Sequence, residues 1–224
     1  LIPTFTFVAT ANAICHLGAI PHFVDINPQN FSLSKDTVKD RLHKVAYKKG
    51  KDIYNKDTGR RISAIVPVHI FGIPGDILGL KDVADEWELP IIEDSTEALG
   101  SKVLRDKNDL VHCGLIGNCG VISFNGNKII TTGGGGMIIT NNENLASKCR
   151  HLSTTAKKDH KWEFFHDQIA WNDRMPNLNA ALGLAQLEVI EKKIDQKNQL
   201  LNKYLESFSN VADAEIVLDK SFNI

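Results

Sequence analysis

One lysine, Lys128, lies in a stretch whose other residues could make its amine a nucleophile. Residues 120–124 before it form an apolar run that predicts a short buried strand, and glycines follow it at 133–136. Such glycines are typical of a loop whose backbone takes unusual torsions or approaches another molecule closely. Desolvation disfavours an ammonium ion, and a neutral amine can attack a carbonyl to form a Schiff base. Lys128 is therefore a candidate nucleophile, and a surface lysine in a glycine-rich hairpin is the alternative.

A second reactive group, the carboxyl of Asp94, follows a predicted strand at residues 89–92. Pyridoxal phosphate chemistry requires a lysine that holds the cofactor aldehyde and a carboxylate that keeps the ring nitrogen protonated. Ser123, a short distance before Lys128 in the chain, could supply a hydroxyl to the cofactor phosphate. The position of Asp94 also allows a simpler interpretation, in which it is the N-cap of a helix.

The elements that must position these residues alternate between strands and helices. Apolar runs predict strands at 20–25, 62–68, 89–92, 120–124 and 137–140. Helical spacing predicts helices at 8–17, from 34, at 80–87, through 145–149 and from 178. This alternation predicts an α/β fold with a mainly parallel sheet, whose ligands bind beyond the carboxyl ends of the strands. Asp94 and Lys128 both follow such ends.

Two parts of the chain lie outside this alternation. Residues 44–61 are basic, polar and aperiodic, which predicts a solvated excursion; a phosphate-binding patch is the alternative and has no glycine cradle to support it. The helical pattern that begins at 178 is long. It indicates either one helix that bridges two domains or two helices with a bend near Lys193.

The domain organisation follows from these elements. Residues 212–218 are expected to form the first strand of a second domain. We therefore assign residues 1–190 to part of a large domain, and residues 191–224 to a linking helix and the start of a small C-terminal domain. Because the chain starts at Leu1 and stops soon after a predicted strand, we expect an internal piece of a longer protein, truncated at both ends.

The composition is that of an ordinary soluble globular protein. Among 224 residues, 42% are hydrophobic and 24% are charged, and the formal net charge is -1, which calls for neither nucleic acid nor an anionic membrane as partner. The four cysteines form no Cys-x-x-Cys pair and no zinc spacing, so no metal is expected. Reduced thiols in a cytoplasm are the predicted state, and no apolar run reaches membrane-spanning length.

Four patches of the sequence resemble the sugar aminotransferases of the DegT/DnrJ/EryC1/StrS family in their residues, order and separation. They are residues 3–12, 93–100, 123–136 and 172–187. The resemblance implies the large domain of fold type I of the pyridoxal-phosphate enzymes, an α/β fold with a mostly parallel central sheet. The wording Ser-Phe-Asn-Gly-Asn-Lys and the opening Pro-Thr-Phe-Thr-Phe look most like the branch that makes bacillosamine and legionaminic acid precursors.

The resemblance also implies roles for single residues. Lys128 is similar to the lysine that holds the cofactor, Asp94 to the acid that pairs with the pyridine nitrogen, and Ser123 to the hydroxyl that contacts the phosphate. Phe7 takes the position of an aromatic residue that stacks on the ring, with a core phenylalanine as the alternative. Glu97 stands near the ring, where many relatives carry glutamine or histidine, so its role is less defined.

Substrates and partners are implied in the same way. Asn172 matches an asparagine that reaches the cofactor phosphate of a neighbouring subunit, which implies a homodimer with a shared active site. The implied reaction moves an amino group from L-glutamate to the C4 ketone of a UDP-linked 4-keto-6-deoxy-N-acetylhexosamine, a nucleotide sugar for cell-surface glycans. Relatives with histidine in place of the lysine are dehydratases, and Lys128 argues against that chemistry.

Two other classes of protein stay open from the sequence. One is a non-catalytic, aminotransferase-like regulator or sugar-nucleotide-binding module, which would bind ligand without transferring an amino group. The other is a nucleotide-binding α/β domain that uses the glycines of residues 114–120. The spacing of these glycines is not the dinucleotide fingerprint, and the segment precedes a predicted strand where the fingerprint follows one.

Overall fold

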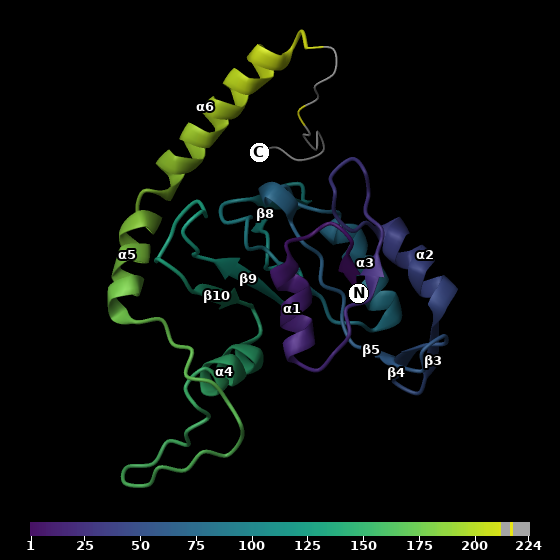
Figure 1. Cartoon of the computed structure of the whole chain (residues 1–224), viewed down its shortest axis with the longest axis vertical. Coiled ribbons are helices and arrows are strands. Elements are labelled where there is room, and N and C mark those ends of the chain that lie inside the picture. Colours follow the sequence, from purple (N-terminus) through teal and green to yellow (C-terminus); the bar gives the residue numbers. More distant parts are fainter. Residues whose placement is uncertain (212–215, 217–224) are drawn as a thin grey trace.

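The computed structural model describes residues 1–211 and 216, and its central sheet carries the candidate site (Figure 1). β6 (Ile92–Asp94) pairs in parallel with β9 (Cys119–Ser123). β9 pairs on its other side with β10 (Gly136–Ile139), which runs antiparallel. The predicted strand before Asp94 and the two predicted strands around Lys128 are therefore neighbours in one sheet.

The sheet continues beyond β6 through shorter contacts. Parallel bridges join Ile65 to Ile91 and Val68 to Asp94. The main-chain nitrogen of Leu1 donates to the carbonyl of Ala64 at 2.7 Å, and β1 (Ile2–Pro3) pairs in parallel with β2 (Phe23–Val24). The two bridges and the pairing of β1 with β2 are parallel, as is the pairing of β6 with β9. The expected α/β fold with a mainly parallel sheet is therefore confirmed.

Helices cover the sheet and connect its strands. The helices are α1 (Val8–His16), α2 (Lys35–Val45), η1 (Ile70–Gly72), α3 (Ile77–Trp87), α4 (Glu143–Leu152), α5 (Asn177–Leu187) and α6 (Ile190–Phe208). The predicted start of α2 is confirmed, because the Ser34 side chain accepts a hydrogen bond from the main chain of Thr37 in a capping box. At α4 the Asn142 side chain is the N-cap and accepts a hydrogen bond from the Leu145 amide.

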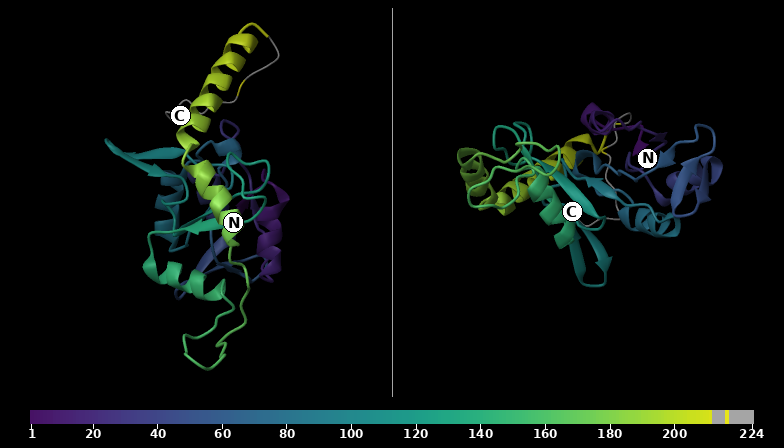
Figure 2. Two further views of the ribbon diagram at one scale, coloured as in Figure 1. Left: turned by 90° about the vertical axis from the view of Figure 1, so that its left-hand side faces the viewer. Right: turned by 90° about the horizontal axis from the view of Figure 1, so that it is seen from below.

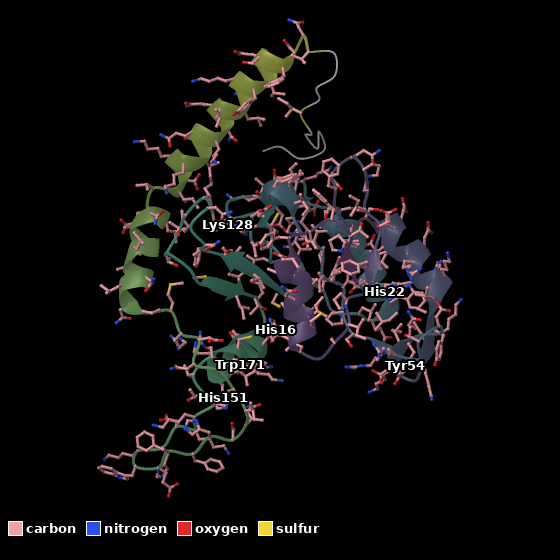
Figure 3. The ribbon with its side chains drawn as sticks, viewed as in Figure 1. His16, His22, Tyr54, Lys128, His151 and Trp171 are labelled. Atoms are coloured by element: carbon pink, nitrogen blue, oxygen red, sulfur yellow. The ribbon has the colours of Figure 1, made fainter. Side chains whose placement is uncertain are left out.

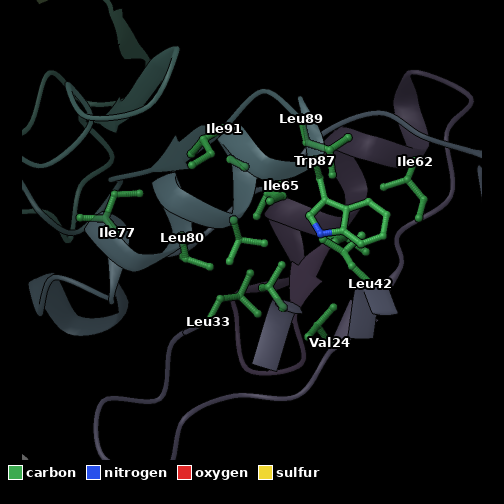
Figure 4. Packing of buried hydrophobic residues seen from close by; sticks show 14 of the residues in the cluster. Val24, Leu33, Leu42, Ile62, Ile65, Ile77, Leu80, Trp87, Leu89 and Ile91 are labelled. Atoms are coloured by element: carbon green, nitrogen blue, oxygen red, sulfur yellow. The ribbon is translucent and has the colours of Figure 1, made fainter. Parts of the chain in front are cut away.

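The main core lies between the strands and the pair α2 and α3 (Figure 4). Its centre consists of side chains with no exposed surface or nearly none: Leu33, Val38, Leu42, Ile65, Ile77, Leu80, Val83 and Ile91. The three- and four-residue steps at which α3 repeats its apolar side chains explain why this helix was predictable. A smaller cluster consists of Ile122, Phe124 and Ile130, and Leu99, Ile139, Met175 and Ile190 pack against it.

The basic segment 44–61 is largely exposed to solvent, but it is not irregular. It forms β3 (Ala46–Lys49) and β4 (Asp52–Asn55), which pair antiparallel, and β5 (Arg61–Ile62) pairs antiparallel with β4. The strands are too short for an alternating pattern to stand out, and only one face is apolar. A second unpredicted hairpin joins β7 (Lys102–Asp106) to β8 (Asp109–His112).

The long helical pattern after residue 178 is two helices, as one of the alternatives predicted. The break lies between the end of α5 at Leu187 and the start of α6 at Ile190, earlier than the expected bend near Lys193. Figures 1 and 2 show α6 extending beyond the body of the molecule. Apart from Ile216, the predicted strand at 212–218 lies outside the described residues. Within the described chain, no helix is both long enough and apolar enough to cross a membrane.

Candidate cofactor site

Lys128 lies in the loop between β9 and β10, and its amine is directed at a carboxylate. Its Nζ is 3.2 Å from Glu97 Oε1, and 18% of the Lys128 side chain is exposed. The surface-lysine alternative is therefore a poor description, because the side chain is largely covered and has a fixed partner. Figure 3 shows Lys128 above the sheet at the edge where β9 ends.

The glycine-rich loop is built for tight backbone geometry. Gly133 and Gly135 have φ angles of 78° and 92°, in the left-handed region that other residues rarely adopt. The Phe124 carbonyl accepts hydrogen bonds from the Thr132 amide and the Thr131 hydroxyl, both at 3.0 Å. The expected unusual torsions are confirmed, and the loop is anchored on both sides of Lys128.

Helix α5 fixes the far side of this loop. The Asn179 side-chain amide donates to the Thr132 carbonyl at 2.6 Å, and that of Gln186 donates to the Thr131 carbonyl. A Cβ on Gly183 would lie 2.7 Å from the Thr132 methyl carbon, so the helix approaches the loop closely. These contacts explain why the family-like patch at 172–187 accompanies the lysine stretch: its helix holds the lysine loop in place.

Glu97 joins the lysine to a second loop. Its Oε1 faces Lys128, while its Oε2 accepts a hydrogen bond from the Phe71 amide at 2.8 Å. Phe71 has φ 56° and ψ 17°, a left-handed conformation that a bulky residue rarely takes. At the neighbouring Gly72, a Cβ would lie 2.8 Å from the Glu97 carbonyl oxygen. Glu97 therefore contacts the candidate nucleophile directly, which its sequence position alone did not establish.

Asp94 ends β6 and is held by donors on both oxygens. The Thr10 hydroxyl donates to Oδ2 at 2.7 Å, and the Thr96 amide donates to Oδ1 at 3.3 Å. No helix begins after Asp94; the chain turns through 96–100 and continues into β7. The N-cap interpretation of Asp94 is therefore wrong. Because β6 and β9 are adjacent and parallel, Asp94 and the loop that carries Lys128 leave the same edge of the sheet.

A buried acid next to Asp94, Glu93, was missed by the sequence analysis. It has no exposed surface and accepts hydrogen bonds from the amides of Gly114, Ile116 and Gly117, at 2.7, 2.8 and 2.6 Å. These amides belong to the segment considered as a nucleotide-binding turn, and Glu93 already occupies them. A charged residue inside an apolar strand was the available signal, since buried charges require partners.

The fourth partner of Glu93 is His69, which is also fully buried, at 3.0 Å between Nε2 and Oε2. The Gly75 amide donates to His69 Nδ1 at 3.1 Å, so Nδ1 is the acceptor and Nε2 carries the proton that Glu93 accepts. Burial acts to raise the pKa of Glu93, but the hydrogen bonds from His69, Gly117 and Gly114 outweigh it, and the pKa lies below its ordinary value.

The other predicted site residues, Ser123, Phe7 and Asn172, lie among the described residues and form no hydrogen bond with Lys128 or Asp94. Ser123 ends β9, and its hydroxyl oxygen accepts from the Asn125 amide at 3.3 Å. Phe7 precedes α1 and is 78% exposed, so the core-phenylalanine alternative is wrong. Asn172 is exposed and bridges to Thr154 on the segment that follows α4. Figure 3 shows Trp171, its neighbour, far from Lys128 within this chain.

These residues fit pyridoxal phosphate. A covered amine at Lys128, a carboxylate at Asp94 on the same sheet edge and a hydroxyl at Ser123 provide the three kinds of group that the aldehyde, ring nitrogen and phosphate require. The fold and this set of groups match those of the large domain of fold type I of the pyridoxal-phosphate enzymes.

The chain belongs to the DegT/DnrJ/EryC1/StrS aminotransferase family, whose model matches residues 1–221. It is 36% identical to the GDP-perosamine synthase of Vibrio cholerae over 204 residues, which are 91% of this chain and 50% of that protein. The aminotransferase TlmJ of Streptoalloteichus hindustanus aligns with a TM-score of 0.83 and 28% identity, over 97% of this chain and 54% of that one. An aminotransferase of the same family from Brucella abortus aligns with a TM-score of 0.80 and 27% identity, over 94% and 52%.

The family is dependent on pyridoxal phosphate, and its named members include sugar aminotransferases. This chain spans about half the length of the curated relatives that it matches. The described residues include both Lys128 and Asp94.

Proposed function

We propose that the protein is a pyridoxal-phosphate-dependent aminotransferase that uses L-glutamate to aminate the C4 ketone of a UDP-linked 4-keto-6-deoxy-N-acetylhexosamine. The observation that carries the proposal is the shared sheet edge: β6 ends in Asp94, and the parallel strand β9 leads directly to Lys128. An amine and a carboxylate placed in this way are the groups that the aldehyde and the ring nitrogen of the cofactor need from the protein. Membership of a sugar aminotransferase family supports the substrate class.

The residues of the chain would divide the work. Pyridoxal phosphate, when bound, supplies an electron sink for the carbon that gains or loses the amino group. Lys128 would hold the cofactor through Nζ and, once displaced by the donor amine, move a proton at Nζ to and from the reacting carbons. Glu97, 3.2 Å from Nζ, would orient the freed amine, and Asp94 would accept the hydrogen bond of the ring nitrogen. The hydroxyl of Ser123 would donate to the phosphate, and Phe7 would stack on the ring.

We propose a homodimer in which Asn172 serves the partner's site. In this chain the segment with Trp171 lies away from Lys128, and its neighbouring side chains are unusually exposed for apolar residues: Ile169 is 96% exposed and Leu178 is 87% exposed. Apolar surface of this extent is typical of a protein interface. A second copy covering it would bring its own Asn172 within reach of a cofactor held by Lys128.

The proposal includes the division of the chain and its cellular place. Residues 1–190 would belong to the large domain, and 191–224 would lead into the small C-terminal domain, with α6 as the link that extends beyond the body. The enzyme would act in the cytoplasm. The four cysteines are free thiols in the structure, as expected for a reducing compartment.

The identity of the nucleotide and of the sugar is the most specific part of the proposal. The sequence wording resembles the bacillosamine and legionaminic acid branch, in which the substrate is UDP-linked. Several relatives are named GDP-perosamine synthase, a name that refers to a GDP-linked sugar. Offering both the UDP-linked and the GDP-linked 4-keto-6-deoxy sugar to the aminated protein distinguishes the two assignments.

The test is the absorption spectrum of the full-length protein with added pyridoxal phosphate. We expect a visible band in the wild type and in Lys148→Ala, a change of an exposed lysine on α4, but not in Lys128→Ala. Glutamate should bleach the band and the keto sugar should restore it. A wild type without the band would refute the proposed role of Lys128. A band that neither glutamate nor keto sugar changes would favour the non-catalytic ligand-binding alternative.

A further inference from the structure

Helix α1 is attached to the rest of the molecule in an unusual way. Of its residues Val8–His16, only Thr10 is buried, with 8% of its surface exposed. Helices normally bury an apolar face, and here the buried side chain carries a hydroxyl. The position of that hydroxyl is therefore the feature of α1 that calls for an explanation.

The Thr10 hydroxyl is part of a directed chain of hydrogen bonds. Thr10 Oγ1 donates to Asp94 Oδ2 at 2.7 Å, and Thr6 Oγ1 lies 2.9 Å from Thr10 Oγ1. A hydroxyl has one proton to donate, and the ionised carboxylate can only accept. Thr10 therefore gives its proton to Asp94, and its oxygen is the acceptor in the contact with Thr6, whose hydroxyl also lies 3.3 Å from the Phe7 carbonyl.

These hydrogen bonds limit the rotation of the Asp94 carboxylate. The Thr96 amide holds Oδ1 and the Thr10 hydroxyl holds Oδ2. Each carboxylate oxygen can accept a second hydrogen bond, so a lone pair stays available in a fixed direction. Threonine suits this task because its β-branched side chain has few rotamers and therefore keeps the hydroxyl in place.

We propose that Thr10 is a positioning residue, which orients the Asp94 carboxylate toward the protonated ring nitrogen of the cofactor. The inference rests on the proposed function, because it assumes that Asp94 pairs with that nitrogen. Thr10 itself does not touch the cofactor in this scheme. Without its hydroxyl, Oδ2 loses the contact that fixes the carboxylate plane, and the bond to the ring nitrogen becomes weaker.

The test compares Thr10→Val with Thr10→Ser in the full-length protein. Valine has nearly the shape of threonine but no hydroxyl, whereas serine keeps the hydroxyl. Thr10→Val should weaken binding of pyridoxal phosphate about 10-fold, the scale of one hydrogen bond to a charged group, and should shift the visible band of the bound cofactor. Thr10→Ser should keep the affinity within about threefold of the wild type. Thr140→Val is the control, because Thr140 follows the end of β10 that lies away from Ser123. It should change neither the affinity for pyridoxal phosphate nor the visible band.

A double-mutant cycle shows whether Thr10 acts through Asp94. In an Asp94→Asn background, Thr10→Val should change the affinity less than twofold, because the group that it positions is already altered. Equal effects of Thr10→Val with and without Asp94 intact would overturn the inference, as would a Thr10→Val protein that binds like the wild type. Loss of affinity in Thr10→Ser equal to that in Thr10→Val would show a packing role and also overturn it. A wild type without a visible band would instead refute the proposed function itself.

Discussion

At the scale of single residues, the edge of the sheet holds two neighbouring acids with opposite environments. Glu93 is buried, and its carboxylate accepts four hydrogen bonds. Each oxygen of Asp94, on the opposite face of the strand, accepts one hydrogen bond and can accept another. Successive side chains of a strand face opposite sides, which is why adjacent residues can differ so completely. The buried acid fastens the turn at 114–117 and the loop at His69 to the strand that presents Asp94.

This environment makes Glu93 a pH-dependent source of stability. Its pKa is held below the ordinary value of 4.5, so the folded protein binds this proton less tightly than the unfolded chain does. The stability that Glu93 contributes is therefore complete above about pH 4.5 and is lost as the pH falls through the lowered pKa.

We predict that Glu93→Gln lowers the free energy of unfolding by about 3 kcal/mol at pH 7, because the amide cannot accept from all four donors and brings two donors of its own. Urea titrations at pH 7 and pH 4 measure this cost, which should shrink at the lower pH. The exposed Glu206→Gln on α6 is the control and should change stability by less than about 0.5 kcal/mol. An unchanged urea midpoint for Glu93→Gln would contradict the account.

At the scale of elements, periodicity decided what could be predicted. Helices α2 and α3 repeat apolar residues over eleven positions and have clear caps, so both were expected near their observed places. The strands at 46–62 show their pattern over four residues or fewer, with a lysine on each face of β3, and they were missed. The end of α5 was misplaced because residues 188–189 carry neither glycine nor proline.

The candidate site followed the same rule. Lys128, Asp94 and Ser123 could be nominated because they end strands or follow them, and ends of strands are visible in the sequence. Thr10 and His69 could not, because their roles depend on contacts between segments far apart in the chain. Such contacts arise from the sheet order, which places α1 and the loop after residue 68 beside β6, and no local pattern encodes that order.

The three-stranded insert docks on the core through its inner face. Ile53 on β4 is 3% exposed and belongs to the main hydrophobic core, while Tyr47 and Tyr54 stack on the outer face with ring centroids 5.9 Å apart. Lys48 donates to the Glu86 carbonyl at 2.9 Å and thereby ties β3 to α3. The insert is thus a folded extension of the core, attached through Ile53 and Lys48.

For this element we predict that Ile53→Ala lowers the free energy of unfolding by about 2 to 4 kcal/mol, through lost apolar burial and the cavity left behind. Lys49→Ala, on an exposed position of β3, should change it by less than about 0.5 kcal/mol. Chemical denaturation of the two variants provides the comparison. Equal, small effects would mean that the insert does not pack on the core as the structure shows.

At the scale of the whole molecule, the segment that follows α4 projects from the body and carries exposed aromatic side chains (Figure 1). The segment after α4 is held at its base, where His151 Nε2 lies 2.8 Å from Asp167 Oδ1 and the Trp171 amide donates to the Leu152 carbonyl. Beyond it, Trp162 and Phe164 are 78% and 81% exposed. Figures 1 and 2 show this segment projecting from the body at the end opposite to α6. A symmetric pair of subunits would cover such surfaces on both copies at once.

The proposed dimer predicts that two inactive subunits can repair each other. If Asn172 serves the partner's cofactor, a mixed dimer of Lys128→Ala and Asn172→Ala has one site with both residues intact and one with neither. Since equal mixing makes half of the dimers mixed, and each has one good site of two, transaminase activity should recover to about a quarter of the wild type. Each variant alone should stay well below this level. Activity that never exceeds the mean of the two separate variants would show that Asn172 serves its own subunit or neither, and would remove the shared site from the proposal.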